Sequence, residues 1–124
     1  MMNPKELAQR IAATLDEKKG DNIMVLDVKH LTSITDYFVI ASANNTIKVH
    51  ALAEAVEEKL EQEDIPVRRK EGQREARWVV LDYASVIVHL FHEEERAYYN
   101  IERLWMDGGN LTPFLPKDAE EERI

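Results

Sequence analysis

The chain has no cysteine, and this absence removes three kinds of chemistry. No disulfide can form, no thiolate can hold zinc and no thiol can act as a nucleophile. No stretch approaches the roughly 20 apolar residues of a membrane-spanning helix. Residues 1–19 mix charged and apolar side chains, unlike a signal peptide or an acid-free transit peptide. We therefore expect a cytoplasmic protein in a reducing compartment, without a membrane partner.

Basic residues are in the minority. The 124 residues include 16 Lys and Arg against 24 Asp and Glu, which gives a formal net charge of -8. Negative charge opposes attraction to nucleic-acid phosphates and favours a basic partner. We therefore expect little or no direct nucleic-acid binding. The length suits one domain with a core of its own.

Hydrophobic spacing predicts three helices and five strands. The helices are expected over residues 4–19, 45–63 and 93–107, and the strands over 23–28, 37–41, from 65 onward, 78–82 and 85–91. The order α-β-β-α-β-β-β-α predicts an α/β (α+β) fold, a single domain with a mixed five-stranded sheet and three helices over residues 1–109. Residues 110–124 are acidic and contain proline, and we expect them to form a C-terminal tail.

The strands 78–82 and 85–91 sort their residues onto two unlike faces. If Tyr83 and Ala84 form the turn, Trp78 pairs with His89. One face is then purely aliphatic, with Val79, Leu81, Val86, Val88 and Leu90. The other face mixes apolar, hydrogen-bonding and charged groups, with Trp78, Val80, Asp82, Ser85, Ile87, His89 and Phe91. A mixed face suits recognition. Three helices could all pack on the aliphatic face and leave the mixed face open.

The last predicted helix carries several aromatic residues. Its expected buried stripe consists of Ala97, Tyr98, Ile101, Leu104 and Trp105. Tyr99 projects away from this stripe at helical spacing, so an interface role and simple exposure are equally compatible with the pattern.

Candidate catalytic and metal-binding groups are sparse. Asp82 could act as a general base, with Asp27 or Asp36 as a second carboxylate, as in magnesium-dependent nucleotidyl transfer. Such sites usually carry an Asp-x-Asp pair and a Gly-Ser phosphate loop, and neither motif is present. His89 and His92 lie three residues apart on a predicted strand, point to opposite faces and specify no third ligand. We therefore expect no metal and no cofactor.

The segment 68–77 is locally basic, with five basic and two acidic residues. It could contact RNA, but a solvated loop explains the same composition. An RNA-binding assembly factor and a nucleotide-dependent enzyme remain the alternative functions.

Several segments together resemble the ribosomal silencing factor family, also called RsfS or Iojap-like. They are ITDYFVIAS at 34–42, EG at 71–72, WVVLDY at 78–83, VIVHLF at 86–91 and YYNIERLW at 98–105. The resemblance implies a nucleotidyltransferase-like domain that has lost catalytic residues. It also implies that the chain binds ribosomal protein L-fourteen on the large ribosomal subunit. Bound there, it would block joining of the small subunit and lower translation under nutrient limitation.

The resemblance also implies where the partner binds. The family's Trp-x-x-x-Asp-Tyr segment falls on Trp78, Asp82 and Tyr83, and its last-helix motif includes Tyr99. With His89 on the same predicted face, these five residues are the expected partner-binding site. We expect a translational repressor that is not an enzyme, and that can form a homodimer when free.

The family usually has glycine after the Asp-Tyr pair, where this chain has Ala84. If the position needs a positive φ, alanine costs about 1 kcal/mol. The turn then differs from the one assumed, or the register is shifted by one residue and the two faces are exchanged.

Overall fold

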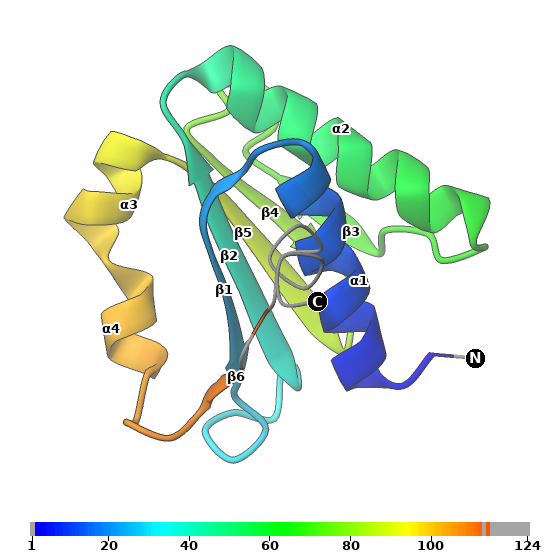
Figure 1. Cartoon of the computed structure of the whole chain (residues 1–124), viewed down its shortest axis with the longest axis vertical. Coiled ribbons are helices and arrows are strands. Elements are labelled where there is room, and N and C mark those ends of the chain that lie inside the picture. Colours follow the sequence, from blue (N-terminus) through cyan, green and yellow to red (C-terminus); the bar gives the residue numbers. More distant parts are fainter. Residues whose placement is uncertain (1, 113, 115–124) are drawn as a thin grey trace, which may run out of the picture.

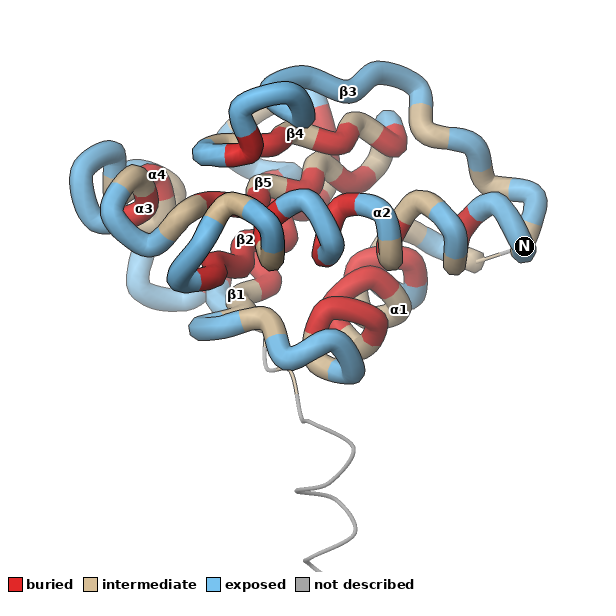
Figure 2. Tube along the Cα trace, turned by 90° about the horizontal axis from the view of Figure 1, so that it is seen from above, coloured by how far each residue is buried: buried red, intermediate tan, exposed pale blue. Residues whose placement is uncertain are grey.

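The computed structural model describes residues 2–112 and residue 114, which form one mixed sheet with helices on both faces. The elements are α1 (Pro4–Glu17), β1 (Asp21–Asp27), β2 (Tyr37–Ala43), α2 (Thr46–Gln62), β3 (Arg69–Glu71), β4 (Trp78–Asp82), β5 (Val86–His92), α3 (Glu93–Tyr99), α4 (Ile101–Trp105) and β6 (Leu111–Thr112). The strand order is β3-β4-β5-β2-β1-β6. Only β2 and β5 run parallel among these paired strands. Helices α1 and α2 lie on one face and α3 and α4 on the other (Figure 1, Figure 2).

The first two helices begin where the sequence predicts, because asparagine side chains cap them. The side chain of Asn3 accepts a hydrogen bond from the backbone N–H of Glu6 at 2.8 Å, and Pro4 occupies the first helical turn. Asn45 accepts the N–H of Lys48 at 2.8 Å in the same way. Both helices then place their apolar stripes on the sheet.

Two hydrophobic cores form, one on each face of the sheet. The larger core joins α1 and α2 to the buried aliphatic residues of the strands. The smaller core lies under α3 and α4 and contains Leu26, Val28, Phe38, Ile40, Phe91 and Ile101. Strand β2 is buried along its whole length, which confirms its prediction as a central strand.

The expected counts of strands and helices were wrong. The sheet has six strands because Leu111–Thr112 adds to the edge of β1. Residues 65–67 form no strand, and β3 begins only at Arg69. Pro66 has no N–H to donate to a neighbouring strand. Pairing with β4 begins after Pro66, where the N–H of Arg68 donates to the carbonyl oxygen of Asp82 at 2.8 Å.

The last predicted helix is broken into α3 and α4 at Asn100, whose φ of 46° is left-handed. The break turns α4 away from the axis of α3, so a stripe calculated for one continuous helix does not persist. Ile101 is buried and Trp105 is half-buried, as expected. The expectation for the other stripe residues was wrong, because Tyr98 and Leu104 are 81% and 76% exposed and Ala97 is exposed as well. The arrangement considered from the sequence, with all helices on one face, was also wrong, because α3 and α4 lie on the face opposite α1 and α2 (Figure 1).

The hairpin of β4 and β5 keeps its predicted faces in a different register. Trp78 pairs with Phe91 and Val80 with His89, a shift of two residues from the expected pairing. Side chains alternate with a period of two, so this shift leaves every residue on its predicted face. The turn moves by one residue to Ala84 and Ser85, because the N–H of Tyr83 donates to the carbonyl oxygen of Val86 at 2.9 Å, and Ala84 has a φ of 69°. The positive φ is therefore present, without the exchange of faces that a one-residue shift would cause.

The expected tail begins with ordered residues. Asn110 is buried and Leu111–Thr112 forms β6, so these residues belong to the sheet. Residues 113 and 115–124 lie outside the described residues. The division into a domain over 1–109 and a tail over 110–124 stays a prediction.

Candidate partner-binding surface

Helices α3 and α4 cover only part of their sheet face, and the rest we call the open face. It consists of Trp78, Val80 and Asp82 on β4 and Ile87 and His89 on β5, all half-buried. The intervening residues Val79, Leu81, Val86, Val88 and Leu90 point to the opposite face and are fully buried. The alternation follows from the pleat of the strands. A surface with apolar, aromatic and hydrogen-bonding groups remains accessible beside the helices.

Trp78 is the centre of an aromatic cluster at one end of the open face. Its ring stacks on Phe91 with centroids 4.9 Å apart and also lies 4.9 Å from the ring of Tyr99. Its indole N–H donates to Nδ1 of His89 at 3.1 Å. Burial lowers the pKa of His89 to about 4, so this ring is neutral near pH 7 and can accept the bond. Trp78 thus contacts Phe91, Tyr99 and His89, and the rest of its surface is partly exposed to solvent.

A hollow of about 590 Å³ adjoins Trp78 between the 72–77 loop and α3. It is lined by Gly72, Gln73, Arg74, Glu75, Arg77, Trp78, Glu95 and Tyr99. Gly72 is required at its position, because its φ is 79° and an added Cβ would lie 2.0 Å from the carbonyl oxygen of Trp78. The loop can therefore approach β4 closely only with glycine here, and this closeness shapes the hollow.

The structure brings together three of the five residues predicted for the site. Trp78, His89 and Tyr99 are neighbours. Asp82 lies on the same face at the far end of β4, where its side chain accepts the backbone N–H of Ala84 at 2.7 Å. Its carboxylate therefore also stabilises the turn.

Tyr83 lies apart from the other predicted residues. Its side chain is packed in the core under α1 and α2 and is 6% exposed. Burial raises the pKa of Tyr83 well above its usual range, and the charges of Glu57 and Glu61 on α2 add to the shift. The hydroxyl finds no hydrogen-bond partner among the described residues. Tyr83 does not line the open face.

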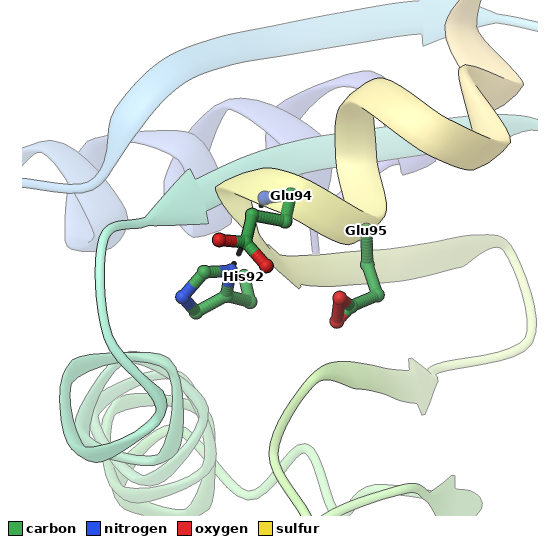
Figure 3. A group of neighbouring side chains, drawn as sticks. All are labelled: His92, Glu94 and Glu95. Carbon is green, nitrogen blue, oxygen red and sulfur yellow. Dashed lines mark hydrogen bonds between the residues drawn. The ribbon is translucent and has the colours of Figure 1, made fainter.

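His92, Glu94 and Glu95 come within 4.8 Å of one another at the start of α3 (Figure 3). His92 Nδ1 accepts the backbone N–H of Glu94 at 3.1 Å, so this nitrogen caps the helix. Glu95 forms a two-point ion pair with Arg77, with one contact at 2.6 Å. These groups already have structural partners. His89, the other histidine considered as a ligand, is not in the group.

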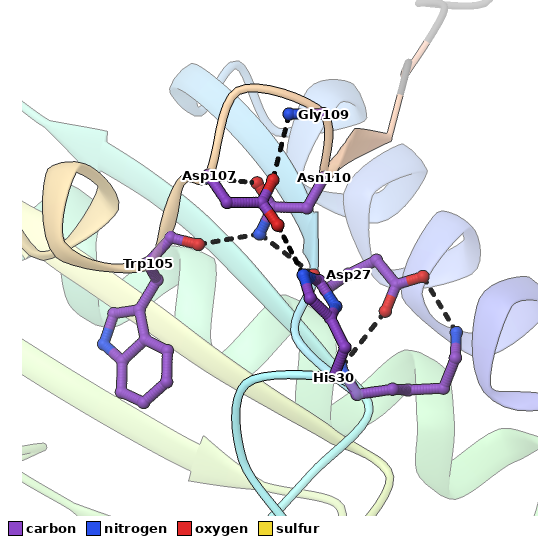
Figure 4. Close-up of polar contacts among 7 residues, drawn as sticks. Asp27, His30, Trp105, Asp107, Gly109 and Asn110 are labelled. Carbon is purple, nitrogen blue, oxygen red and sulfur yellow. Dashed lines mark hydrogen bonds and ion pairs between the residues drawn. The ribbon is translucent and has the colours of Figure 1, made fainter.

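The three aspartates considered for catalysis do not form a cluster within the described residues. Asp27 lies at the end of β1 (Figure 4), where Lys29 contacts its carboxylate at 2.9 Å. Burial would raise the pKa of Asp27, but the hydrogen bonds and charge of Lys29 outweigh it and hold the pKa below its usual value. A carboxylate with a lowered pKa is a weak general base at neutral pH.

Two of the basic residues of the 68–77 segment have acidic partners on helices. Lys70 contacts Glu57 of α2 at 2.9 Å, and Arg77 pairs with α3. Arg68, Arg69 and Arg74 are exposed and form no ion pair in the part of the chain that the structure describes. Two of the five positive charges are therefore offset locally.

Sequence reasoning missed the polar residues that attach α3 and α4 to the sheet. Asn110 donates to the backbone carbonyls of Asp27 at 3.0 Å and Trp105 at 2.7 Å, and its own oxygen accepts the N–H of Asp107 (Figure 4). The buried Arg96 side chain contacts Glu102 and the backbone carbonyl of Asp21. Nothing in the spacing marks either residue, because each bond joins segments that are distant in sequence or separated by a turn.

These features define a class of protein: an α+β domain with a half-covered mixed sheet and an aromatic-centred surface open to a partner. Comparison with known proteins identifies the family. Residues 1–123 match the family model described as ribosomal silencing factor during starvation. The chain therefore belongs to the ribosomal silencing factor family, as its motifs indicate.

Individual relatives span most of the chain. The Bacillus subtilis protein named ribosomal silencing factor RsfS is 40% identical over 106 residues, which cover 86% of this chain and 90% of that protein. A crystal structure of a Chromobacterium violaceum protein matches with a TM-score of 0.82 at 32% identity, covering 96% of this chain and 98% of that one. The mouse protein named mitochondrial assembly of ribosomal large subunit protein 1 is 30% identical over 98 residues, 77% of this chain and 43% of that protein.

The family name describes a regulatory function connected with the ribosome. Membrane attachment through a spanning helix finds no support, since none of the helices within residues 2–112 is both long enough and apolar enough to cross a bilayer.

Proposed function

We propose that this chain is a non-catalytic translational repressor of the cytoplasm that binds the large ribosomal subunit through ribosomal protein L-fourteen. Bound there, it occupies space that the small subunit must enter, and it lowers translation under nutrient limitation. The open face around Trp78 is the observation that carries the proposal. A half-exposed tryptophan held by neighbouring rings is the kind of anchor on which protein interfaces depend.

Charge and family membership support this partner. The net charge of -8 suits a basic ribosomal protein, and charges at the rim of an interface mainly speed association. The mouse relative's name refers to assembly of the large ribosomal subunit, which favours that subunit over the small one. Steric occlusion needs neither a cofactor nor convergent catalytic groups, and the separation of Asp27 from Asp82 by two strands accords with that.

Co-sedimentation with isolated ribosomal subunits at physiological salt tests the proposal. We expect saturable binding to the large subunit alone, binding to purified L-fourteen, and slower joining of the subunits by light scattering. Ile47→Ala is the matched control, because Ile47 is 82% exposed at the start of α2, away from the open face. Trp78→Ala should lose affinity and Ile47→Ala should keep it. Absence of binding to either subunit would reject the proposal.

The open face also supports the proposed homodimer. Two copies could bury their Trp78 clusters against each other, and the ribosomal partner would then compete with the second copy. Sedimentation equilibrium should show a monomer–dimer equilibrium that Trp78→Ala shifts toward monomer. A dimer that persists in this variant would place the contact elsewhere.

A nucleotide-dependent enzyme is the alternative of another class. Calorimetry with ATP and magnesium should show no binding if the chain acts only by occlusion. Measurable binding would support an enzymatic role for Asp27, Asp36 or Asp82.

The RNA-binding alternative rests on Arg68, Arg69 and Arg74. It predicts binding to naked ribosomal RNA with an affinity that falls steeply with salt. Binding that requires L-fourteen would argue against it.

A further inference from the structure

The hydrogen bond between His89 and Trp78 determines which nitrogen of the His89 ring carries the proton. Nδ1 of His89 accepts the indole N–H of Trp78 at 3.1 Å, so the single proton of the neutral ring is on Nε2. Nε2 is buried and has no hydrogen-bond partner among the described residues. The imidazole therefore makes its one side-chain hydrogen bond to Trp78 and leaves its own donor unsatisfied.

Two phenyl rings also pack against His89. Phe38 lies edge-to-face at 5.0 Å, and Phe91 lies nearly parallel at 6.3 Å. A phenyl ring in place of the imidazole would fill this space without burying an unsatisfied N–H, whose desolvation costs stability. Packing alone gives no reason for a histidine here. The bond to Trp78 does give one.

We propose that His89 is a positioning residue, which holds the indole of Trp78 in the orientation that the partner binds. This inference rests on the proposed function and adds what keeps the Trp78 side chain ordered before the partner binds. The side chain of Trp78 has two rotatable bonds, and Phe91 and Tyr99 restrict it only through ring contacts. The directional N–H···N bond selects one orientation of the indole within that space. An anchor that is already ordered loses less conformational entropy on binding.

The partner therefore touches Trp78 and not His89. This proposal differs from the role expected for His89 from its predicted face, where it was grouped with the residues that contact the partner. With Nε2 buried beneath the aromatic cluster, the imidazole has no free polar edge to offer.

Two substitutions separate the hydrogen bond from the packing. His89→Phe keeps a ring of similar size but removes the acceptor. His89→Asn loses the ring, but its carbonyl oxygen lies about where Nδ1 lies and can accept the indole N–H. Stability and affinity should therefore respond in opposite order: His89→Phe should melt at the wild-type temperature or above, and His89→Asn should melt lower.

Affinity for the large subunit is measured by co-sedimentation, and the indole N–H signals of Trp78 and Trp105 by two-dimensional NMR. We expect about fivefold weaker binding for His89→Phe, the size of effect typical of one hydrogen bond, and nearer wild-type binding for His89→Asn. The Trp78 signal should move and exchange faster with solvent in His89→Phe, whereas the Trp105 signal stays in place. If His89→Asn does not fold, the affinity and the Trp78 signal of His89→Phe decide the inference alone.

Each outcome decides the inference. Weaker binding of a stable His89→Phe together with a shifted Trp78 signal supports it. Wild-type binding by His89→Phe overturns it and leaves the proposed function standing. Failure of the wild-type chain to bind the large subunit overturns the proposed function, and the positioning role with it.

Discussion

The two faces of the sheet differ in composition and in burial, although adjacent residues of the same strands form them. On the face under α1 and α2, Leu81 and Val88 are completely buried among aliphatic side chains. On the other face, Trp78 and His89 lie among aromatic rings and are only partly covered. The first face is closed by two long helices, whereas the second is closed in part by two short ones.

The difference shows how a small domain combines stability with recognition. The larger core, on the aliphatic face, contributes more to stability than the smaller one, because stabilisation scales with the apolar area removed from water. The second face then tolerates a partly exposed tryptophan and an imidazole whose Nε2–H is buried and unsatisfied. We expect substitutions on the first face to change stability and substitutions on the second to change binding.

The largest effect should come from the closed face. Leu81→Ala should lower the free energy of unfolding by about 2–5 kcal/mol, because it removes a fully buried side chain and leaves a cavity. Chemical denaturation measures this loss, and the folded fraction should still bind the large subunit. Val80→Ala, the neighbouring substitution on the open face, should cost clearly less. Equal losses at both positions would contradict the division between the faces.

Trp78→Ala should weaken partner binding and change stability little, the reverse of Leu81→Ala. We expect partner affinity to fall by about 2 kcal/mol or more, because the substitution removes the aromatic anchor of the interface. The fold should persist, since the larger core lies on the other face. Titration with L-fourteen and thermal melting measure the two effects separately. A large fall in melting temperature with unchanged affinity would make Trp78 a core residue.

The pH dependence of stability should reveal the buried imidazole. The pKa of His89 is lowered to about 4 in the folded chain, below the ordinary value of 6.5 that applies when the chain is unfolded. Between these values the unfolded state binds more protons, so the free energy of unfolding falls as the pH decreases from 6.5 toward 4. The contribution is about 1.4 kcal/mol per pH unit in that window.

Urea denaturation at several pH values, compared between the wild type and His89→Phe, checks this prediction. The difference in stability between the two should change with pH below 6.5 and stay constant above it. A pH-independent difference would show that His89 has an ordinary pKa in the fold.

The smallest effect concerns the turn that joins the two strands. Ala84→Gly should raise the free energy of unfolding by about 0.5–1 kcal/mol, because glycine adopts the φ of 69° without strain but loses more entropy on folding. Neither face should change, so partner affinity should stay at the wild-type value. Ala51→Gly in α2 is the control and should destabilise by about 1 kcal/mol. Destabilisation in both variants would argue against the left-handed turn.

Much of the fold follows from local pattern. Asparagine caps and apolar spacing indicate α1 and α2, and the continuous apolar run of residues 37–41 indicates the central strand β2. The two faces of the β4–β5 hairpin also follow from alternation, because a register shift of two residues leaves them unchanged. The family motifs indicate the class of function, since they are distributed through the chain in order.

Other features depend on contacts between distant segments, and spacing does not encode them. The break at Asn100 depends on how α3 and α4 fit the second face, and Asn110 acts only where β1 and α4 meet. Of the five residues predicted for the site, Trp78, His89 and Tyr99 come together, but Tyr83 lies in the core because it follows Val79 and Leu81 on the closed face of the strand.

The sequence by itself therefore determined the central elements, the two-faced hairpin and the family. Periodicity and capping act within a few residues, so they can be read along the chain. Only the tertiary structure decided how much of the second face is covered, which aromatic residue is left half-exposed, and that His89 orients Trp78. These properties depend on packing between elements, where the free energy comes from contacts that no local pattern specifies.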